Sequence, residues 1–546
     1  MVLPLSVPQI SARDIAGVEL DPIKVNQWLE SLPLLNVADT SRKLFSTLST
    51  HNRVAFDDAQ RLALLELFRQ PVRQISLELT KQYIGLPLPL AEKHKSIAEQ
   101  NRQFQLEMAH GYKRLALNAI ARNDAIGVAA TQATLARVIQ RAIRHLTEVL
   151  AVSFQTYSPY PADVWKEIHA LYSHAENFKL AGMEVDDPLN KAVAKSSIDH
   201  AYKQALLLDF SDPYNLPPRM IDRVHHYLDR WAPLAQLSVA TAAYEPTCQF
   251  LIDPQHDQAG AAYSAYASLD NPKRYRLLKT VDLARQVYTQ LTLLKGGQTP
   301  PADGLKEDFF VEAGQDVLRR VLSAWGINPQ RSFRRSPRTG HQIEMAIGLE
   351  AINYWINGGR KFVVSSSFVG PIPQQRTQIG AGDARPANAK LPPRDFSTWD
   401  IDDESAGGLS LSKRGNINVH IQVGDLIITR TPGDGNPWSI GVIRWVRSPG
   451  SSNIEIGIQR LAPNADPVVI KTVAEDNKES DFLPALLLPE IRPLKQPQSL
   501  VTHRGVCKPD SLIYMDNGYR LYKIEPAKLI EAGHSFEQFR FEILNP

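Results

Sequence analysis

A run of arginines is the first feature of this chain that could do chemistry. Residues 331–338 read Arg-Ser-Phe-Arg-Arg-Ser-Pro-Arg, without an acidic residue. Each guanidinium is a planar fork of donors that can bind two phosphate oxygens at once, or the O6 and N7 acceptors of guanine. Placed just before a predicted strand, the run indicates a flexible arm that wraps an anionic ligand. On the arginines alone, a solvated charge run after a helix is the alternative.

A second polar cluster lies further along the chain. Residues 403–408 read Asp-Glu-Ser-Ala-Gly-Gly and form a bend between the apolar residues Ile401 and Leu409. An aspartate accepts hydrogen bonds from the N1 and N2 donors of guanine, and a serine hydroxyl bonds a base edge or a phosphate. Glycine lets the backbone approach a ligand closely. The bend therefore predicts a polar half-site, although alone it could be an ordinary hairpin connection.

Together the arm and the bend resemble the PilZ domain family of cyclic di-GMP receptors, over about residues 325–470. That family carries RxxxR in an arm before its first strand and [D/N]xSxxG on its barrel. The positions that the resemblance assigns to cyclic di-GMP are Arg334, Arg335 and Arg338 in the arm and Asp403, Ser405 and Gly408 in the bend, with Arg331, Gly407 and Trp445 as further candidates.

Two assignments within the resemblance stay open. Arg331 and Arg335 also fit RxxxR, but we prefer Arg334 with Arg338 because this pair lies nearer the strand. Trp445 lies in a stretch that looks like a late strand of the family, where it could be near a guanine or simply be a core residue. The interval between arm and bend is longer than usual in the family, but a surface insertion costs little loop-closure entropy.

The resemblance implies a signalling receptor that binds cyclic di-GMP and controls motility, pili, biofilm or exopolysaccharide. It implies no catalytic residues, no metal and no cofactor. We expect mutual repulsion to keep the arginine arm mobile without ligand, and the ligand's charge to order the arm on the barrel. Because the arm follows a helix that ends at Trp325, its ordering could reposition the helical region.

Composition sets the broad class. A chain of 546 residues is expected to hold two to four domains, and 43% hydrophobic with 22% charged residues is ordinary for a soluble protein. A net charge of +3 is too near zero for a nucleic-acid coat protein, so we expect no DNA partner. Two distant cysteines, no secretory signal and no membrane-spanning apolar run predict a cytoplasmic protein.

Residues 1–325 are predicted to form a helical bundle or solenoid-like region. Around residues 135–150 the apolar side chains recur on one helical face, and Arg141 and Arg144 lie on the other. Residues 160–215 resemble a tetratricopeptide helix pair, although the two halves are further apart than the repeat allows and an ordinary helical hairpin is the alternative. Such an array offers a surface on which an unidentified protein partner would dock.

After the helical region, the hydrophobic residues no longer recur at helical spacing. Residues 326–470 alternate in the manner of short strands separated by turns, which predicts a small antiparallel barrel with an insertion at 349–395 that starts with a short helix. Alternation also predicts a strand over 417–423. Residues 471–546 form a further β-rich segment, either a second barrel or strands that extend the first. The predicted fold class is multidomain α+β.

Three other functions are weighed against the receptor. A degenerate barrel with a helical scaffold would bind proteins and no nucleotide. An enzyme is disfavoured because HExxH, GxSxG, a P-loop and a dinucleotide fingerprint are absent from the sequence. The arginine arm permits RNA binding, but no aromatic residues are interleaved with the basic ones as stacking would require.

Overall fold

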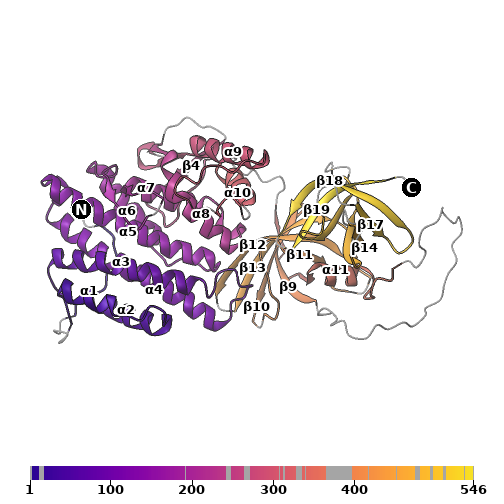
Figure 1. Cartoon of the computed structure of the whole chain (residues 1–546), viewed down its shortest axis with the longest axis horizontal. Coiled ribbons are helices and arrows are strands. Elements are labelled where there is room, and N and C mark those ends of the chain that lie inside the picture. The colour runs from indigo at the N-terminus through magenta and orange to yellow at the C-terminus, as the bar shows by residue number, and fades with distance from the viewer. Residues whose placement is uncertain are drawn as a thin grey trace. The chain divides into compact units, whose positions relative to one another are not determined.

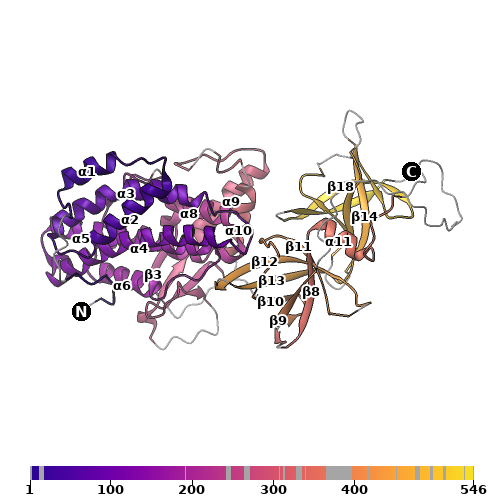
Figure 2. The ribbon, with the colours of Figure 1, turned by 90° about the horizontal axis from the view of Figure 1, so that it is seen from below.

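In the computed structural model, the chain forms two compact units. Unit 1 comprises residues 1–86 and 90–330, and unit 2 comprises residues 87–89 and 331–546. Figures 1 and 2 show the elements of each unit with their labels. The structure describes the whole chain except residues 1–2, 12–17, 191, 241–246, 264–270, 306–307, 312–313, 327–334, 339, 365–395, 416, 434, 451, 474–479, 492–495, 508–511, 534 and 545–546.

Unit 1 is mainly helical. Its α-helices are α1 Pro22–Glu30, α2 Val37–His51, α3 Asp58–Thr80, α4 Glu92–Ala121, α5 Ala129–Gln155, α6 Val164–Asn177, α7 Ile198–Asp209, α8 Pro218–Trp231, α9 Val281–Lys295 and α10 Gly314–Gly326. Short 3-10 turns lie at Asp124–Ile126, Pro213–Asn215, Ala232–Leu234 and Pro272–Arg274. Among the described residues, no helix combines the length and the apolar character that crossing a bilayer would need.

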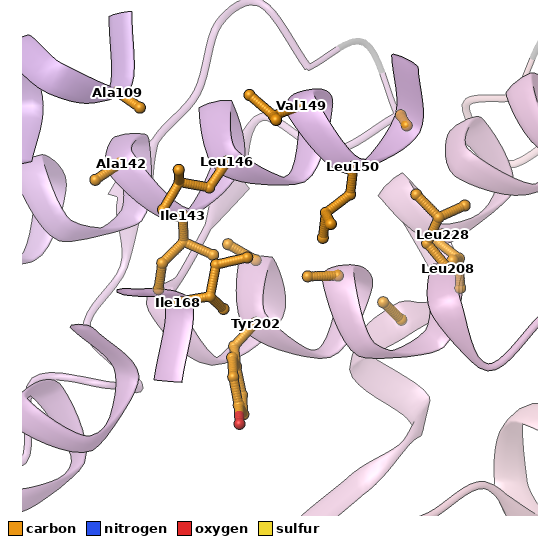
Figure 3. Close-up of a cluster of buried hydrophobic side chains, with 14 of the residues drawn as sticks. Ala109, Ala142, Ile143, Leu146, Val149, Leu150, Ile168, Tyr202, Leu208 and Leu228 are labelled. Atoms are coloured by element: carbon orange, nitrogen blue, oxygen red, sulfur yellow. The ribbon is translucent and has the colours of Figure 1, made fainter. Parts of the chain in front are cut away.

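Helix α5 is the centre of unit 1. It packs against α4, α6, α7 and α8, and its apolar side chains meet those of all four helices in one core. Figure 3 shows Ile143 of α5 pointing toward Ile168 of α6, with Leu146 and Leu150 on the same side of α5. These side chains are fully buried, as the helical periodicity of the sequence predicted.

The polar face of α5 differs from the expectation. An amphipathic surface helix would place Arg141 and Arg144 in water, yet Arg141 is 1% exposed and Arg144 is only partly exposed. Arg141 approaches Asp187 at 3.3 Å, and Arg144 approaches Asp229 at 2.8 Å. Buried guanidinium groups need such partners because desolvation of an unpaired charge is costly. Packing of other elements over both faces of α5 cannot be read from its periodicity.

The stretch that resembles a tetratricopeptide pair forms α6 and α7. Tyr172 of α6 stacks on Tyr202 of α7 with ring centroids 3.9 Å apart. The connection between the helices carries a two-stranded ribbon of β1 Val185–Asp186 and β2 Lys195–Ser196. A tetratricopeptide turn has no room for such a ribbon, so this pair has the connection of an ordinary helical hairpin.

A small sheet in unit 1 was not predicted. It has the strand order β3-β6-β4-β5, from β3 Gln236–Val239, β4 Gln249–Ile252, β5 Ala261–Ala262 and β6 Arg276–Lys279. Each strand has at most four residues. A run this short contains too few alternations to stand out from the helical background.

Unit 2 begins with an antiparallel barrel. Its ring follows the order β10-β13-β12-β11-β8-β9, and pairing of β9 with β10 closes it. The elements are β7 Ser336–Pro337, β8 Gln342–Ile347, α11 Leu349–Ile356, β9 Ser397–Ser405, β10 Gly408–Arg414, β11 Leu426–Arg430, β12 Ser439–Gly450 and β13 Asn453–Ala462. The alternation seen in the sequence therefore predicted the barrel correctly.

One predicted strand of this barrel is wrong. The described residues of 417–423 form no ladder, and Ile421 makes only an isolated bridge to Leu88. Ile421 and Val423 are nevertheless buried, at 0% and 3% exposure. An extended segment that lays alternate side chains on a core produces the same alternation as a strand, because both have a side-chain period of two.

A second barrel completes unit 2. It is closed in the order β14-β15-β16-β19-β18-β17, with β14 Asp466–Val473, β15 Leu483–Leu488, β16 Ser499–His503, β17 Leu512–Asp516, β18 Leu521–Ala532 and β19 Phe536–Ile543. Of the two arrangements left open for the tail, the separate barrel is correct. A hairpin joins β17 to β18. The backbone N–H of Asn517 donates to the carbonyl of Arg520, so the turn is centred on Gly518 and Tyr519.

Helix α11 joins the two barrels. Leu349 and Ile352 lie in a core that contains residues of both. The side-chain amide of Asn353 donates to the carbonyl oxygens of Val468 at 3.0 Å and Ala485 at 2.9 Å, on two strands of the second barrel. Both views show α11 beside β14 (Figures 1 and 2). The barrels therefore share a hydrophobic core at their junction.

Asp425 makes the stability of the first barrel depend on pH. Its carboxylate accepts a hydrogen bond from the backbone of Gln422 at 2.8 Å, but burial dominates and raises its pKa to about 6. The raised pKa means that the folded state holds a proton which the unfolded chain releases near pH 4. Between about pH 4 and 6, stability therefore falls as the pH rises, and the penalty is fully present at neutral pH.

We expect Asp425→Asn to raise the melting temperature of unit 2 by several degrees at neutral pH and to have little effect below about pH 4, because the amide cannot ionise. Scanning calorimetry of the full chain at a series of pH values measures this. Asp400→Asn, at an exposed position, is the matched control. It should leave the pH dependence of the melting temperature as in the parent. Equal melting temperatures for Asp425→Asn and the parent at neutral pH would contradict the assignment.

Candidate functional site

The described end of the arginine arm lies along β9. Strand β7 pairs with the last residues of β9, with Ser336 opposite Glu404 and Pro337 opposite Asp403. Just beyond, the backbone N–H of Arg338 donates to the carbonyl of Asp402 at 3.1 Å. The structure thus brings the arm and the bend side by side, as a shared site requires.

Ion pairs join the arm to the bend. A guanidinium nitrogen of Arg335 lies 2.6 Å from a carboxylate oxygen of Asp403, and Nε of Arg338 lies 3.1 Å from Glu404. The side chains of Arg335 and Arg338 are 33% and 51% exposed, so both reach solvent. We expected repulsion among the arm's arginines to dominate. At this end of the arm the carboxylates neutralise that repulsion.

Arg460 is a site residue that the sequence did not reveal. It comes from β13 and approaches Glu404 at 2.6 Å, while its other guanidinium nitrogen donates to the carbonyl of Ser405 at 2.9 Å. Arg460 and then Arg338 hold the pKa of Glu404 below its usual value. Only the pairing of β13 with β10 carries Arg460 to the bend, so no local pattern could have found it.

Gly408 has a structural reason to be glycine. It lies opposite Gln459 where β10 and β13 meet, and a Cβ at this position would lie 2.2 Å from the carbonyl oxygen of Ile458. Ser405 and Gly408 close the β9–β10 hairpin, with Ala406 and Gly407 in the turn. The serine hydroxyl makes only a long bond of 3.4 Å to the carbonyl of Gly408, which leaves it capable of better bonds.

Trp445 lies on the same face of the barrel as Asp403. Pairing places Asp403 opposite Ser410, Ser410 opposite Gly457 and Gly457 opposite Trp445, and directly opposed residues share a face. Three strand spacings separate the ends of this row, about 14 Å. The indole covers Gly457, since a Cβ there would lie 1.8 Å from its nitrogen. The small residues Ser410 and Gly457, both buried, thus form a platform between Asp403 and Trp445.

Two of the predicted arginines lie in the first half of the arm. Arg331 and Arg334 lie outside the described residues, so the structure does not decide the register of the arm. Among the residues that the structure describes, no group of three or more His, Cys, Asp or Glu side chains is arranged to hold a metal ion.

Comparison with known proteins accounts for almost the whole chain. Residues 23–243 match the family model described as "Cyclic-di-GMP receptor FimW, N-terminal domain", residues 249–376 and 366–467 match "Cyclic-di-GMP receptor FimW, middle PilZ domain", and residues 468–544 match "FimW C-terminal beta-barrel domain". The chain belongs to the PilZ-domain cyclic di-GMP receptor family. The resemblance stated from the arm and the bend is therefore confirmed.

A curated relative agrees with this assignment. The protein named cyclic-di-GMP receptor FimW, from Pseudomonas aeruginosa, is 27% identical over 602 aligned positions, which cover 100% of this chain and 94% of the relative. The PilZ family is one of binding proteins. The prediction that this chain is not an enzyme is confirmed on that ground.

The close approach at Gly408 generates a test of the PilZ barrel. We expect Gly408→Ala to destabilise unit 2 by about 1–3 kcal/mol, because the new methyl group must displace the β13 backbone. Gly450→Ala in the same barrel meets open space and should stay within about 0.5 kcal/mol of the parent. Urea unfolding measures both, and equal midpoints for the two variants would show that β13 does not press on Gly408.

Proposed function

We propose that this chain is a receptor for cyclic di-GMP, which binds between the arginine arm and the bend of the PilZ barrel. The docking of Arg335 and Arg338 against Asp403 and Glu404 is the observation that carries the proposal. It brings phosphate-binding forks and a guanine-binding carboxylate into one place. The relative's name as a cyclic-di-GMP receptor supports it.

Each predicted residue has a role in the proposed complex. The guanidinium groups of the arm bind the two phosphates and the acceptor edge of a guanine. Asp403 accepts from guanine N1 and N2, Ser405 bonds a base edge or a phosphate, and the indole of Trp445 lies against the second base. The proposed ligand-binding residues are Arg334, Arg335, Arg338, Asp403, Ser405 and Gly408, with Arg331, Gly407 and Trp445 as lesser contributors.

Binding in this scheme exchanges ion-pair partners. The pairs with Asp403 and Glu404 are partly exposed, and pairs of that kind contribute only about 0–1 kcal/mol. Phosphates offer the same guanidinium groups charge-assisted, bidentate bonds, which are stronger. The ligand would therefore draw the arm from the carboxylates onto the phosphates and order its full length.

The consequence of binding is a signal to a partner. We propose a cytoplasmic receptor with a helical region at 1–325, a PilZ barrel at 326–470 and a C-terminal β-rich segment at 471–546. Ordering of the arm would change how the helical region presents itself to a protein partner. The output would be control of motility, pili, biofilm or exopolysaccharide. No cofactor, metal or DNA takes part in this scheme.

One observation favours a second function. The guanidinium groups of Arg335, Arg338 and Arg460 already have carboxylate partners. A degenerate barrel that binds proteins and no nucleotide would show the same self-sufficient network. Direct titration separates the two functions, because only the receptor binds the nucleotide.

We expect calorimetric titration to show binding of cyclic di-GMP to the parent, and Arg335→Ala or Arg338→Ala to weaken it at least ten-fold, because each loses charge-assisted bonds to phosphate. Arg414→Ala is the matched control: this exposed arginine lies at the opposite end of β10 from Gly408. Parent-like affinity in both arm variants would remove the arm from the site, and absence of heat in the parent would favour the degenerate barrel.

Trp445 provides a second readout of the same site. We expect cyclic di-GMP to change the tryptophan fluorescence of the parent, because a base on the platform meets the indole. Trp445→Phe should lose most of that change and bind more weakly by a few-fold. Trp28→Phe, at a half-buried tryptophan of unit 1, is the control. An undiminished fluorescence change in Trp445→Phe would place the base elsewhere.

A further inference from the structure

Unit 1 contains a cavity of about 760 Å³ that the nucleotide site does not use. Its walls are single faces of three helices, because its lining recurs at helical spacing from Arg69 to Thr80 on α3, from Arg141 to Gln155 on α5 and from Arg219 to Asp229 on α8. At 1.5 Å per residue these walls are about 15–20 Å long. The cavity is therefore a groove and not a round pocket.

The charged side chains on the floor of this groove form ion pairs with one another. Asp187 lies 2.6 Å from Arg69 and 3.3 Å from Arg141, and Arg144 lies 2.8 Å from Asp229. The side chains of Asp187 and Arg141 are each 2% exposed. Buried ion pairs of this kind neutralise one another and stiffen the fold. Glu66, which lies 3.2 Å from Arg69 and 3.3 Å from Arg141, is the third carboxylate for the three arginines, so the floor has no net charge to attract a ligand.

The rim differs from the floor because two of its arginines, Arg73 and Arg219, are not paired with a carboxylate among the described residues. The lining as a whole holds seven Arg or Lys and five Asp or Glu residues. Arg73 donates to the carbonyl of Leu189, and Arg219 packs over Gly85, where a Cβ would lie 3.0 Å from its Nε. Both guanidinium groups keep donors that can bind an anion.

Two of the acidic residues in the lining lie beside histidines of the same lining. Glu148 lies 3.7 Å from a ring nitrogen of His225, and Asp222 lies 3.6 Å from His226. Apolar side chains lie between the charges in the lining, and Leu77 among them is 48% exposed and so accessible to an occupant. The groove thus suits an occupant that is both acidic and partly apolar.

We propose that this groove binds an extended acidic peptide segment of a partner protein. An extended chain rises about 3.3 Å per residue, so a groove of this length holds about five or six residues. Carboxylates of the segment would pair with Arg73 and Arg219, and an apolar side chain would cover Leu77. A lone phosphate would leave most of the apolar wall exposed. The inference rests on the part of the proposed function that gives unit 1 a protein partner, and not on nucleotide binding.

Selection from a displayed library of random hexapeptides on the full-length chain tests this proposal. The same library is passed over the double variant Arg73→Ser/Arg219→Ser. We expect the parent to enrich sequences in which Asp or Glu alternates with apolar residues. The selected peptides should bind the parent at least ten-fold more tightly than the double variant, with affinity that falls as salt rises.

Two further variants keep the test decisive. Leu77→Asp adds a negative charge at an exposed position, so it should fold like the parent and lose the selected peptides. The double variant Arg42→Ser/Arg285→Ser removes the same charge from arginines that are 76% and 70% exposed outside the groove, and it should bind like the parent. Circular dichroism and cyclic di-GMP titration of every variant show whether folding and the PilZ site are intact.

Three outcomes would overturn the proposal. One is a parent that enriches no peptide over the double variant, and another is enrichment of basic peptides. The third is binding of inorganic phosphate that depends on Arg73 and Arg219 while no peptide is selected. If the chain fails to bind cyclic di-GMP, each of these results can still be interpreted, because the peptide selection needs no nucleotide.

Discussion

The pairing of the arginine arm with the end of β9 is the constraint on which the candidate site depends. Strand β8 occupies the same edge of β9 only as far as Asp400, so the remainder of that edge is open to the arm. Pro337 lacks an N–H, which limits the arm to a short strand at an edge. Two paired residues are enough to position the arm. They hold Arg335 on one side and Arg338 on the other within reach of Asp403 and Glu404.

The second barrel determines which face of the first remains open. Strands β8, β11 and β12 each have apolar side chains on the outer face where they meet α11 and the second barrel, as well as on the face that fills the first barrel. Arg444 of β12 and Glu531 of β18 form a further pair across this junction, at 2.8 Å. Strands β9 and β10 contribute nothing to the shared core. Their outer face is left for the bend, the arm and the platform beneath Trp445.

Local sequence predicted those parts of the fold and site that depend on local order. Spacing within the arm and within the bend singled out Arg335, Arg338 and Asp403, which the structure places side by side. The short helix predicted at the start of the insertion is α11. Arg460 was missed because it reaches the bend only through strand pairing. The strand predicted at 417–423 and the solvated face predicted for α5 failed for a related reason: periodicity shows that a face is covered or polar, but not what lies against it.

The carboxylates that hold the arm bear on selectivity in the proposed complex. A phosphate that takes Arg335 and Arg338 leaves Asp403 and Glu404 without those partners, and a carboxylate without a partner costs free energy wherever it is partly desolvated. Glu404 keeps Arg460, so Asp403 bears the loss. Guanine N1 and N2 supply donors in exchange, whereas an adenine nucleotide brings phosphates and no matching pair of donors. The same acidic residue that positions the arm would then disfavour the wrong base, by leaving its own acceptors unsatisfied.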